Sequence, residues 1–148
     1  MPQSLANVLI HLIFSTKNRE PVIPPDLTSP LHGYIVGILD KLGSRSIQTA
    51  GTRDHVHVLF LQSRTLAIAK VVEEVKKSSS KWMKGQGVRS FTWQAGYAVF
   101  SVSESQKAAV VRYIQRQEAH HRRVGFQDEM REFLVRHGVS YDERYVWD

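Results

Sequence analysis

Cysteine is absent from the 148 residues of the chain, which excludes disulfide frameworks, thiolate zinc sites and cysteine nucleophiles. Long apolar runs are absent too, since none approaches the roughly 20 residues that a membrane span needs. At the N-terminus, Met1–Ala6 does not combine a basic segment with an apolar one, so we see no secretory signal. We therefore expect a cytoplasmic protein without a membrane partner.

Acidic residues are in the minority, because 14 Asp and Glu stand against 20 Lys and Arg and leave a formal net charge of +6. A basic domain of this size is compatible with a polyanionic partner such as nucleic acid, although many basic proteins bind none. The hydrophobic and charged fractions, 42% and 23%, are those of an ordinary globular protein. The length suits one domain with its own core, so we expect residues 1–148 to form a single domain.

Hydrophobic periodicity predicts strands and helices in alternation along the chain. The expected strands are Ser4–Ser15, Arg45–Gly51, His55–Gln62 and Tyr97–Val102, and the expected helices are Thr28–Leu42, Thr65–Lys84, Glu104–His121 and Gln127–His137. This order predicts an α+β fold, a ferredoxin-like split β-α-β antiparallel sheet with two additional C-terminal helices. The fold hosts RNA-binding modules, metal carriers and nucleases alike, so by itself it does not indicate a function.

Two histidines separated by one residue are the most specific local feature. Side chains two apart on a strand project to the same face, so His55 and His57 stand side by side while Val56 points to the opposite layer. Two imidazoles at this spacing can chelate one divalent cation from a rigid strand. Solvent-exposed strand histidines fit the same short motif, but the apolar sequence around the pair favours a metal site.

The third expected helix carries a second candidate group. Tyr113 and Gln117 are four residues apart and so lie one above the other on a single helix face, at the border of an apolar stripe. From this pattern alone, an ordinary amphipathic helix with a half-buried tyrosine at its margin is the favoured interpretation. His120 and His121 end the helix, where they complement its dipole, and we do not expect them to be metal ligands.

Several segments taken together resemble a known family of enzymes. The segments are His11–Arg19, Asp54–His57, Tyr113–His121, Phe126–Glu129 and Tyr141–Asp148. They resemble, in order, the HUH single-tyrosine transposases of the smallest bacterial insertion sequences, within the REP-associated tyrosine transposase superfamily. The similarity extends from His11 to the C-terminus, and an ordered set of segments is far more specific than one short motif.

The resemblance implies roles for individual residues. His55 and His57 match the two histidines of the HUH motif, Tyr113 matches the nucleophile, and Gln117 matches the third metal ligand. The activity implied is that of a metal-dependent transposase that cleaves and rejoins single-stranded DNA through a 5′-phosphotyrosine intermediate. Mg²⁺ or Mn²⁺ is the implied cofactor, and zinc remains compatible with this ligand set.

The resemblance also implies partners: single-stranded DNA that is folded into hairpins at the ends of the element, and a second copy of the chain. Family members form homodimers in which active sites are shared between chains, in the bacterial cytoplasm. We expect phosphate contacts from Lys17, Arg19, Arg53 and Arg122, although most basic side chains of a basic protein are simply solvated.

Two other functions fit parts of the sequence. A non-catalytic nucleic-acid-binding module of ferredoxin-like fold would need aromatic side chains on an open sheet face, where this chain has histidines. A metal-dependent hydrolase could use the histidine pair to activate water. Such a hydrolase leaves no covalent protein–DNA adduct, which separates it from a tyrosine transposase.

Overall fold

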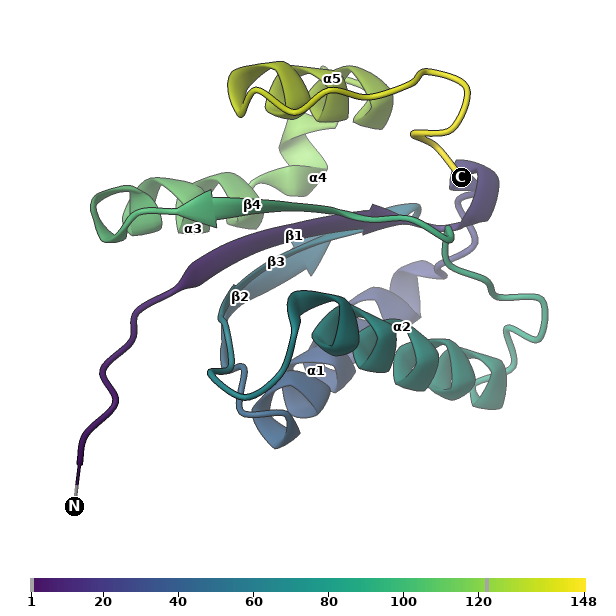
Figure 1. Cartoon of the computed structure of the whole chain (residues 1–148). Helices are drawn as coiled ribbons and strands as arrows, with labels where there is room; N and C mark the ends of the chain where they lie inside the picture. Colours follow the sequence, from purple (N-terminus) through teal and green to yellow (C-terminus); the bar gives the residue numbers. More distant parts are fainter. Residues whose placement is uncertain (1, 122) are drawn as a thin grey trace.

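The computed structural model describes residues 2–121 and 123–148, which form a four-stranded antiparallel sheet with helices on both faces (Figure 1). The strands are β1 (Leu9–Ser15), β2 (Ser46–Gly51), β3 (His55–Leu61) and β4 (Ala98–Val102), in the spatial order β2-β3-β1-β4. The helices are α1 (Pro25–Lys41), α2 (Ile68–Gly85), α3 (Lys107–Gln115), α4 (Gln117–His120) and α5 (Phe126–Arg136), with 3-10 turns η1 (Lys17–Arg19) and η2 (Glu104–Gln106). The predicted α+β fold and its β-α-β-β-α-β order are confirmed.

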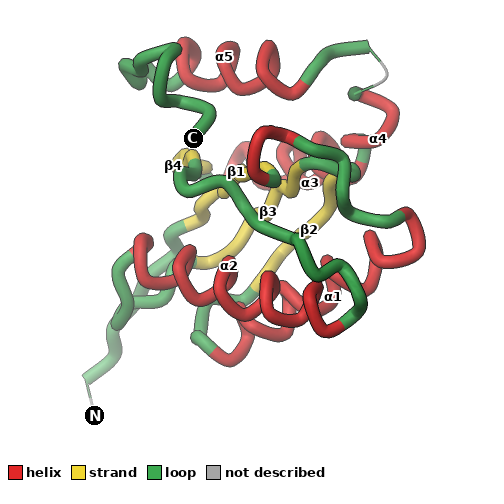
Figure 2. Tube along the Cα trace, turned by 90° about the vertical axis from the view of Figure 1, so that its right-hand side faces the viewer, coloured by secondary structure: helices red, strands yellow, loops and turns green. Residues whose placement is uncertain are grey.

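The inner strands β1 and β3 send alternate side chains into two packed layers. The larger core receives from them Ile10, Leu12, Phe14, Val56, Val58 and Phe60. Helices α1 and α2 lie side by side over this face (Figure 2). The opposite face is covered by α3 and α5, which pack Ile114 against Leu9 and Leu59, and Met130 against Ile13. Both faces of the sheet are therefore buried. A separate finding is that none of the helices in the described ranges has the length and apolar character of a membrane span.

Three predicted boundaries were wrong by three residues or more. Helix α2 begins at Ile68 and not at Thr65, because Ala67 directly before it still has an extended backbone. Strand β1 begins at Leu9 and not at Ser4. Leu9 pairs with Leu61 of β3 and with Val102 of β4, whereas residues 2–8 are exposed. Helix α1 begins at Pro25, before the predicted Thr28, since a proline is well tolerated in the first turn of a helix.

The predicted helix Glu104–His121 is not continuous. It is divided into η2, α3 and α4, and Arg116 between α3 and α4 has φ −100° and ψ 16°, outside the helical range. Beyond this break Gln117 is only 1% exposed, whereas Arg116 is exposed. The sequence has no glycine or proline here to predict a break, so we attribute it to the contacts of Gln117 with the sheet, which outweigh local helix propensity.

Candidate functional site

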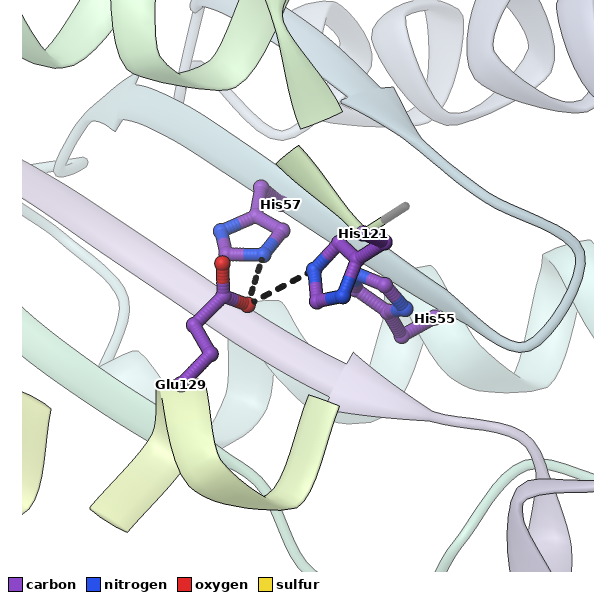
Figure 3. Close-up of side chains that lie close together, drawn as sticks. All are labelled: His55, His57, His121 and Glu129. Atoms are coloured by element: carbon purple, nitrogen blue, oxygen red, sulfur yellow. Dashed lines mark hydrogen bonds and ion pairs between the residues drawn. The ribbon is translucent and has the colours of Figure 1, made fainter. Parts of the chain in front are cut away.

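The two histidines of β3 lie on the sheet face that α3, α4 and α5 cover. Their side chains are fully buried, and the centroids of the His55 and His57 rings are 5.2 Å apart. Figure 3 shows both rings beside His121, which follows α4, and Glu129 of α5. The alternation of the strand thus brings the pair to one face, and the helices above that face complete the cluster.

Glu129 is the acceptor at the centre of this cluster. Its carboxylate is 2% exposed and lies 3.0 Å from His57 Nε2 and 3.2 Å from His121 Nε2, both measured to Oε1 (Figure 3). Its other oxygen, Oε2, is 3.0 Å from His120 Nε2 and accepts a hydrogen bond from the Tyr113 hydroxyl. A buried carboxylate is costly unless it is paired, and here five side chains pair with it, Gln117 being the fifth.

Gln117 lies beside Glu129 in this cluster, and its Nε2 is 3.5 Å from Glu129 Oε2. Its side-chain oxygen Oε1 is 3.2 Å from His55 Nε2 and 2.9 Å from His121 Nε2. The structure therefore brings the three sequence-predicted ligand residues, His55, His57 and Gln117, together in one buried cluster. The Tyr113 ring lies beside this cluster, with its centroid 5.8 Å from that of His57.

Hydrogen bonds fix the orientation of both β3 imidazoles. Nδ1 of His55 is 2.7 Å from Asp54 Oδ1 and 2.9 Å from Thr52 Oγ1. Nδ1 of His57 is 2.8 Å from Nε2 of the buried His11 on β1. In both rings Nε2 is therefore left facing the cluster, which is the arrangement found when a histidine ligates a metal through one nitrogen and is held by the other.

The donor set fits a divalent cation. One ligand atom from each of His55, His57, His121 and Glu129 lies within 4.8 Å of all the others, and the oxygen of Gln117 adjoins them. Imidazole nitrogen with carboxylate and amide oxygen suits Mn²⁺ and other divalent transition ions better than a purely oxygen-seeking ion such as Mg²⁺. The cluster is thus a candidate metal site whose carboxylate balances part of the charge of the ion.

The buried carboxylate and its surroundings shift the protonation of neighbouring groups. Burial raises the pKa of Glu129, but hydrogen bonds from His121 and His57 outweigh burial and hold that pKa well below its usual range. Burial raises the pKa of the Tyr113 hydroxyl far above its usual value, and the charge of Glu129 adds to this. Burial also lowers the pKa of His57 to about 4, against the effect of Glu129, so this imidazole is neutral at physiological pH.

The basic residues that the sequence predicts to contact phosphate are not members of the buried cluster. Lys17 and Arg19 are in η1, directly after β1, whose last residue Ser15 pairs with His55. Arg53 is exposed in the turn before β3, and its Nε donates to the carbonyl oxygen of Ile23 at 3.2 Å. These three side chains therefore belong to segments at the His55 end of the strands, and Arg122 lies outside the described residues.

Two members of the cluster were not predicted from the sequence. His121 was expected to complement a helix dipole and not to be a metal ligand; in the structure it lies against Gln117 and Glu129 and joins the candidate ligand group. In the sequence, Glu129 stood out only as the last residue of Phe126–Glu129, one of the segments that resemble the transposase family. One signal was present, because Glu129 occupies a position on the apolar face of its helix, with Phe126, Met130 and Leu134, where an acid needs partners.

The fold and the site together define an α+β protein with a tyrosine beside a buried cluster of histidines and a carboxylate. Residues 4–117 match the model of the family described as "Transposase IS200 like", and the chain belongs to this family. The match includes His55, His57, Tyr113 and Gln117, whereas His121 and Glu129 lie beyond its end.

Individual relatives agree with this family. The ISDra2 transposase TnpA of Deinococcus radiodurans is 27% identical over 114 residues, which cover 72% of this chain and 81% of the relative. Among solved structures, a candidate transposase from Deinococcus radiodurans R1 has a TM-score of 0.62 at 24% identity, covering 79% of this chain and 98% of that one. A REP-associated tyrosine transposase bound to a REP hairpin has a TM-score of 0.59 at 15% identity, covering 82% and 72% respectively. These two structures share the fold.

Proposed function

We propose that this chain is a metal-dependent DNA strand transferase that cleaves and rejoins single-stranded DNA through Tyr113. The observation that carries the proposal is the position of the Tyr113 hydroxyl, which lies against Glu129 at the edge of the His55–His57 cluster in a chain of the IS200-like transposase family. The direct test is to incubate the protein with labelled single-stranded DNA and Mn²⁺ and to look for a covalent protein–DNA adduct after denaturation.

The proposed reaction exchanges one phosphodiester bond for another. The Tyr113 hydroxyl gives up its proton as its oxygen attacks the scissile phosphorus, and the bond from phosphorus to the 3′ oxygen breaks. The leaving 3′ oxygen takes up one proton in return, so the strand ends in a 3′-OH. The product is a 5′-phosphotyrosine, whose ester bond a second 3′-OH can attack in the reverse sense. Because the phosphoester is conserved at each step, rejoining requires no ATP.

The resting state of Tyr113 explains why the cluster is needed. Burial and the charge of Glu129 raise the pKa of the hydroxyl, so at neutral pH the phenol is protonated and a weak nucleophile. The hydroxyl donates its hydrogen to Glu129 and is thereby held in a defined direction. A divalent cation, Mn²⁺ or Mg²⁺, held by His55, His57 and Gln117 with Glu129, would supply positive charge that stabilises the transition state at phosphorus.

The burial of the histidine face argues against a non-catalytic binding module. Modules that bind nucleic acid on an open sheet expose aromatic side chains on that surface. In this chain α3 and α5 cover the sheet, and His55 and His57 are fully buried beneath them. Such an arrangement favours a closed chemical site over an open binding platform.

We further propose that the substrate is single-stranded DNA folded into hairpins at the element ends, since a related structure is bound to a REP hairpin. A hairpin taken from the DNA that flanks the gene should bind more tightly than a random duplex of the same length. Its affinity should fall steeply as salt is raised, because a protein of formal charge +6 releases counterions from phosphates. Fluorescence anisotropy across a salt series measures both effects, and equal affinity for hairpin and duplex would contradict hairpin recognition.

On the resemblance alone we propose a homodimer in which each Tyr113 serves the histidines of the other chain. In the described chain the phenol lies by its own Glu129, so exchange requires the partner's Tyr113 to occupy that same place. Mixing a Tyr113→Phe chain with a His55→Ala chain should then restore one active site for each mixed dimer. Adduct formation in the mixture but in neither variant alone is the expected result. No adduct in a mixture of proven heterodimers would show that each site is built from one chain.

A further inference from the structure

A cavity of about 590 Å³ opens on the outer side of α3 and α4, next to Tyr113. We call it the arginine cavity, and it is lined by Ala109, Arg112, Tyr113, Arg116, Ala119, His120 and Arg123. The lining residues recur every three or four positions, so they form one side of the α3–α4 segment despite the break at Arg116. Two small alanines leave space between long basic side chains.

The arginine cavity is strongly cationic. Arg112, Arg116 and Arg123 are exposed, and among the side chains that the structure describes no carboxylate belongs to the lining. Among the described side chains, none of the three arginines forms an ion pair, whereas Arg131, Arg136 and Arg144 are each paired with an acidic residue. Three guanidinium groups without acidic partners around one cavity predict an anionic ligand.

A second cavity, of about 320 Å³, lies on the other side of Tyr113 and has the opposite character. It shares Ala109, Tyr113 and His120 with the arginine cavity, but it is also lined by Glu129 and Glu132. Arg136 also lines it, and that arginine is paired with Glu132 at 2.6 Å. Tyr113 therefore stands at the boundary between a cationic cavity and one that carries two carboxylates, one of them buried.

From this contrast we infer that the arginine cavity binds the phosphodiester backbone of single-stranded DNA immediately beside the bond that Tyr113 cleaves. The inference rests on the proposed function and adds the direction of approach. Phosphates reach Tyr113 over α3 and α4, because three arginines line that approach, whereas the one arginine of the second cavity, Arg136, is already paired with Glu132. The cavity would hold the strand without reading its bases, since guanidinium groups contact phosphate oxygens.

The spacing of the arginines favours a polymer over a single free anion. Arg112 and Arg116 are separated by about 6 Å along a helix axis at about 1.5 Å per residue, and Arg123 lies farther on, after α4. Side chains distributed in this way can each contact a different phosphate along a strand. A free phosphate ion would engage fewer of them and should bind much more weakly.

The test compares two triple variants with the same loss of charge. In the first, Arg112, Arg116 and Arg123 are replaced together by glutamine; in the control, the exposed Arg45, Arg64 and Arg89, which line neither cavity, are replaced by glutamine. Affinity for a fluorescein-labelled oligothymidylate is measured by anisotropy over a NaCl series, with a chelator present so that binding is separated from cleavage. Thermal unfolding of both proteins verifies that these surface changes leave the fold intact.

We expect the cavity variant to bind the oligothymidylate about tenfold or more weakly than wild type. The slope of log K against log salt should also become less steep by about 2, because each of the three lost phosphate contacts contributes about 0.7. The control should keep nearly the wild-type slope. Equal losses in both variants, or a loss in neither, would overturn the inference. Inorganic phosphate that competes as well as the oligothymidylate would overturn the assignment to a polymer.

This result can be told apart from failure of the proposed function. Suppose that wild type forms no covalent adduct with DNA but the cavity variant still loses oligothymidylate binding. The strand-transfer proposal then fails, while the inference about the arginine cavity stands. If the adduct forms but the cavity variant binds oligothymidylate like the control variant, the proposed function stands and the inference about the arginine cavity is wrong. An Arg116→Lys variant adds a further check, because lysine keeps the charge but not the paired donors of the guanidinium group.

Discussion

A Tyr113→Phe protein should form no covalent adduct with single-stranded DNA, while it still binds DNA and metal. The substitution removes one hydroxyl and almost no volume, so the attacking oxygen is lost but the packing of α3 is kept. Loss of a covalent nucleophile reduces a reaction of this kind by on the order of 10⁴-fold or more. The hydrogen bond to Glu129 is also lost, at an expected cost of about 1 kcal/mol in the free energy of unfolding.

The measurement is a denaturing gel of protein incubated with labelled DNA and Mn²⁺. Tyr97→Phe is the matched control, because it deletes the same atom from a side chain that is 40% exposed and lines a separate cavity beside Lys76. Adduct formation by Tyr113→Phe would place the nucleophile on another tyrosine. Loss of the adduct in Tyr97→Phe alone would point to that residue.

Removing one ligand from the buried cluster should strongly weaken metal binding. We expect His57→Ala to weaken Mn²⁺ binding by at least about 100-fold, because it removes an imidazole that is already neutral and oriented by His11. Glu129→Gln should weaken binding as well, since it replaces an anionic oxygen donor by a neutral amide of the same shape. Isothermal titration of Mn²⁺ into the metal-free proteins measures both changes.

Matched controls distinguish ligand loss from general damage. His137→Ala removes an exposed histidine outside the cluster, and Glu132→Gln makes the same change as Glu129→Gln at an exposed position of the same helix. Both should bind Mn²⁺ like wild type. Wild-type affinity in His57→Ala would disprove the metal site, and wild-type affinity in Glu129→Gln would restrict the ligands to the histidines and Gln117.

Much of the architecture follows from local periodicity in the sequence. A strand alternates its side chains, so His55 and His57 had to share a face, and apolar residues on both sides of β1 required a central strand. Likewise, the spacing of Tyr113 and Gln117 predicted that the two lie close together, although the break at Arg116 places them in α3 and α4 and not on one continuous helix. These predictions needed only backbone geometry, which the sequence determines over a few residues.

The tertiary structure decided which distant groups complete the site. Glu129 is 72 residues from His57 in the chain, and its role depends on how α5 packs against β1 and β4. The break at Arg116, which local propensity did not predict, comes directly before the buried Gln117. Periodicity is set by neighbouring residues and can be predicted from them, whereas a buried carboxylate among histidines is set by packing between elements far apart in the chain.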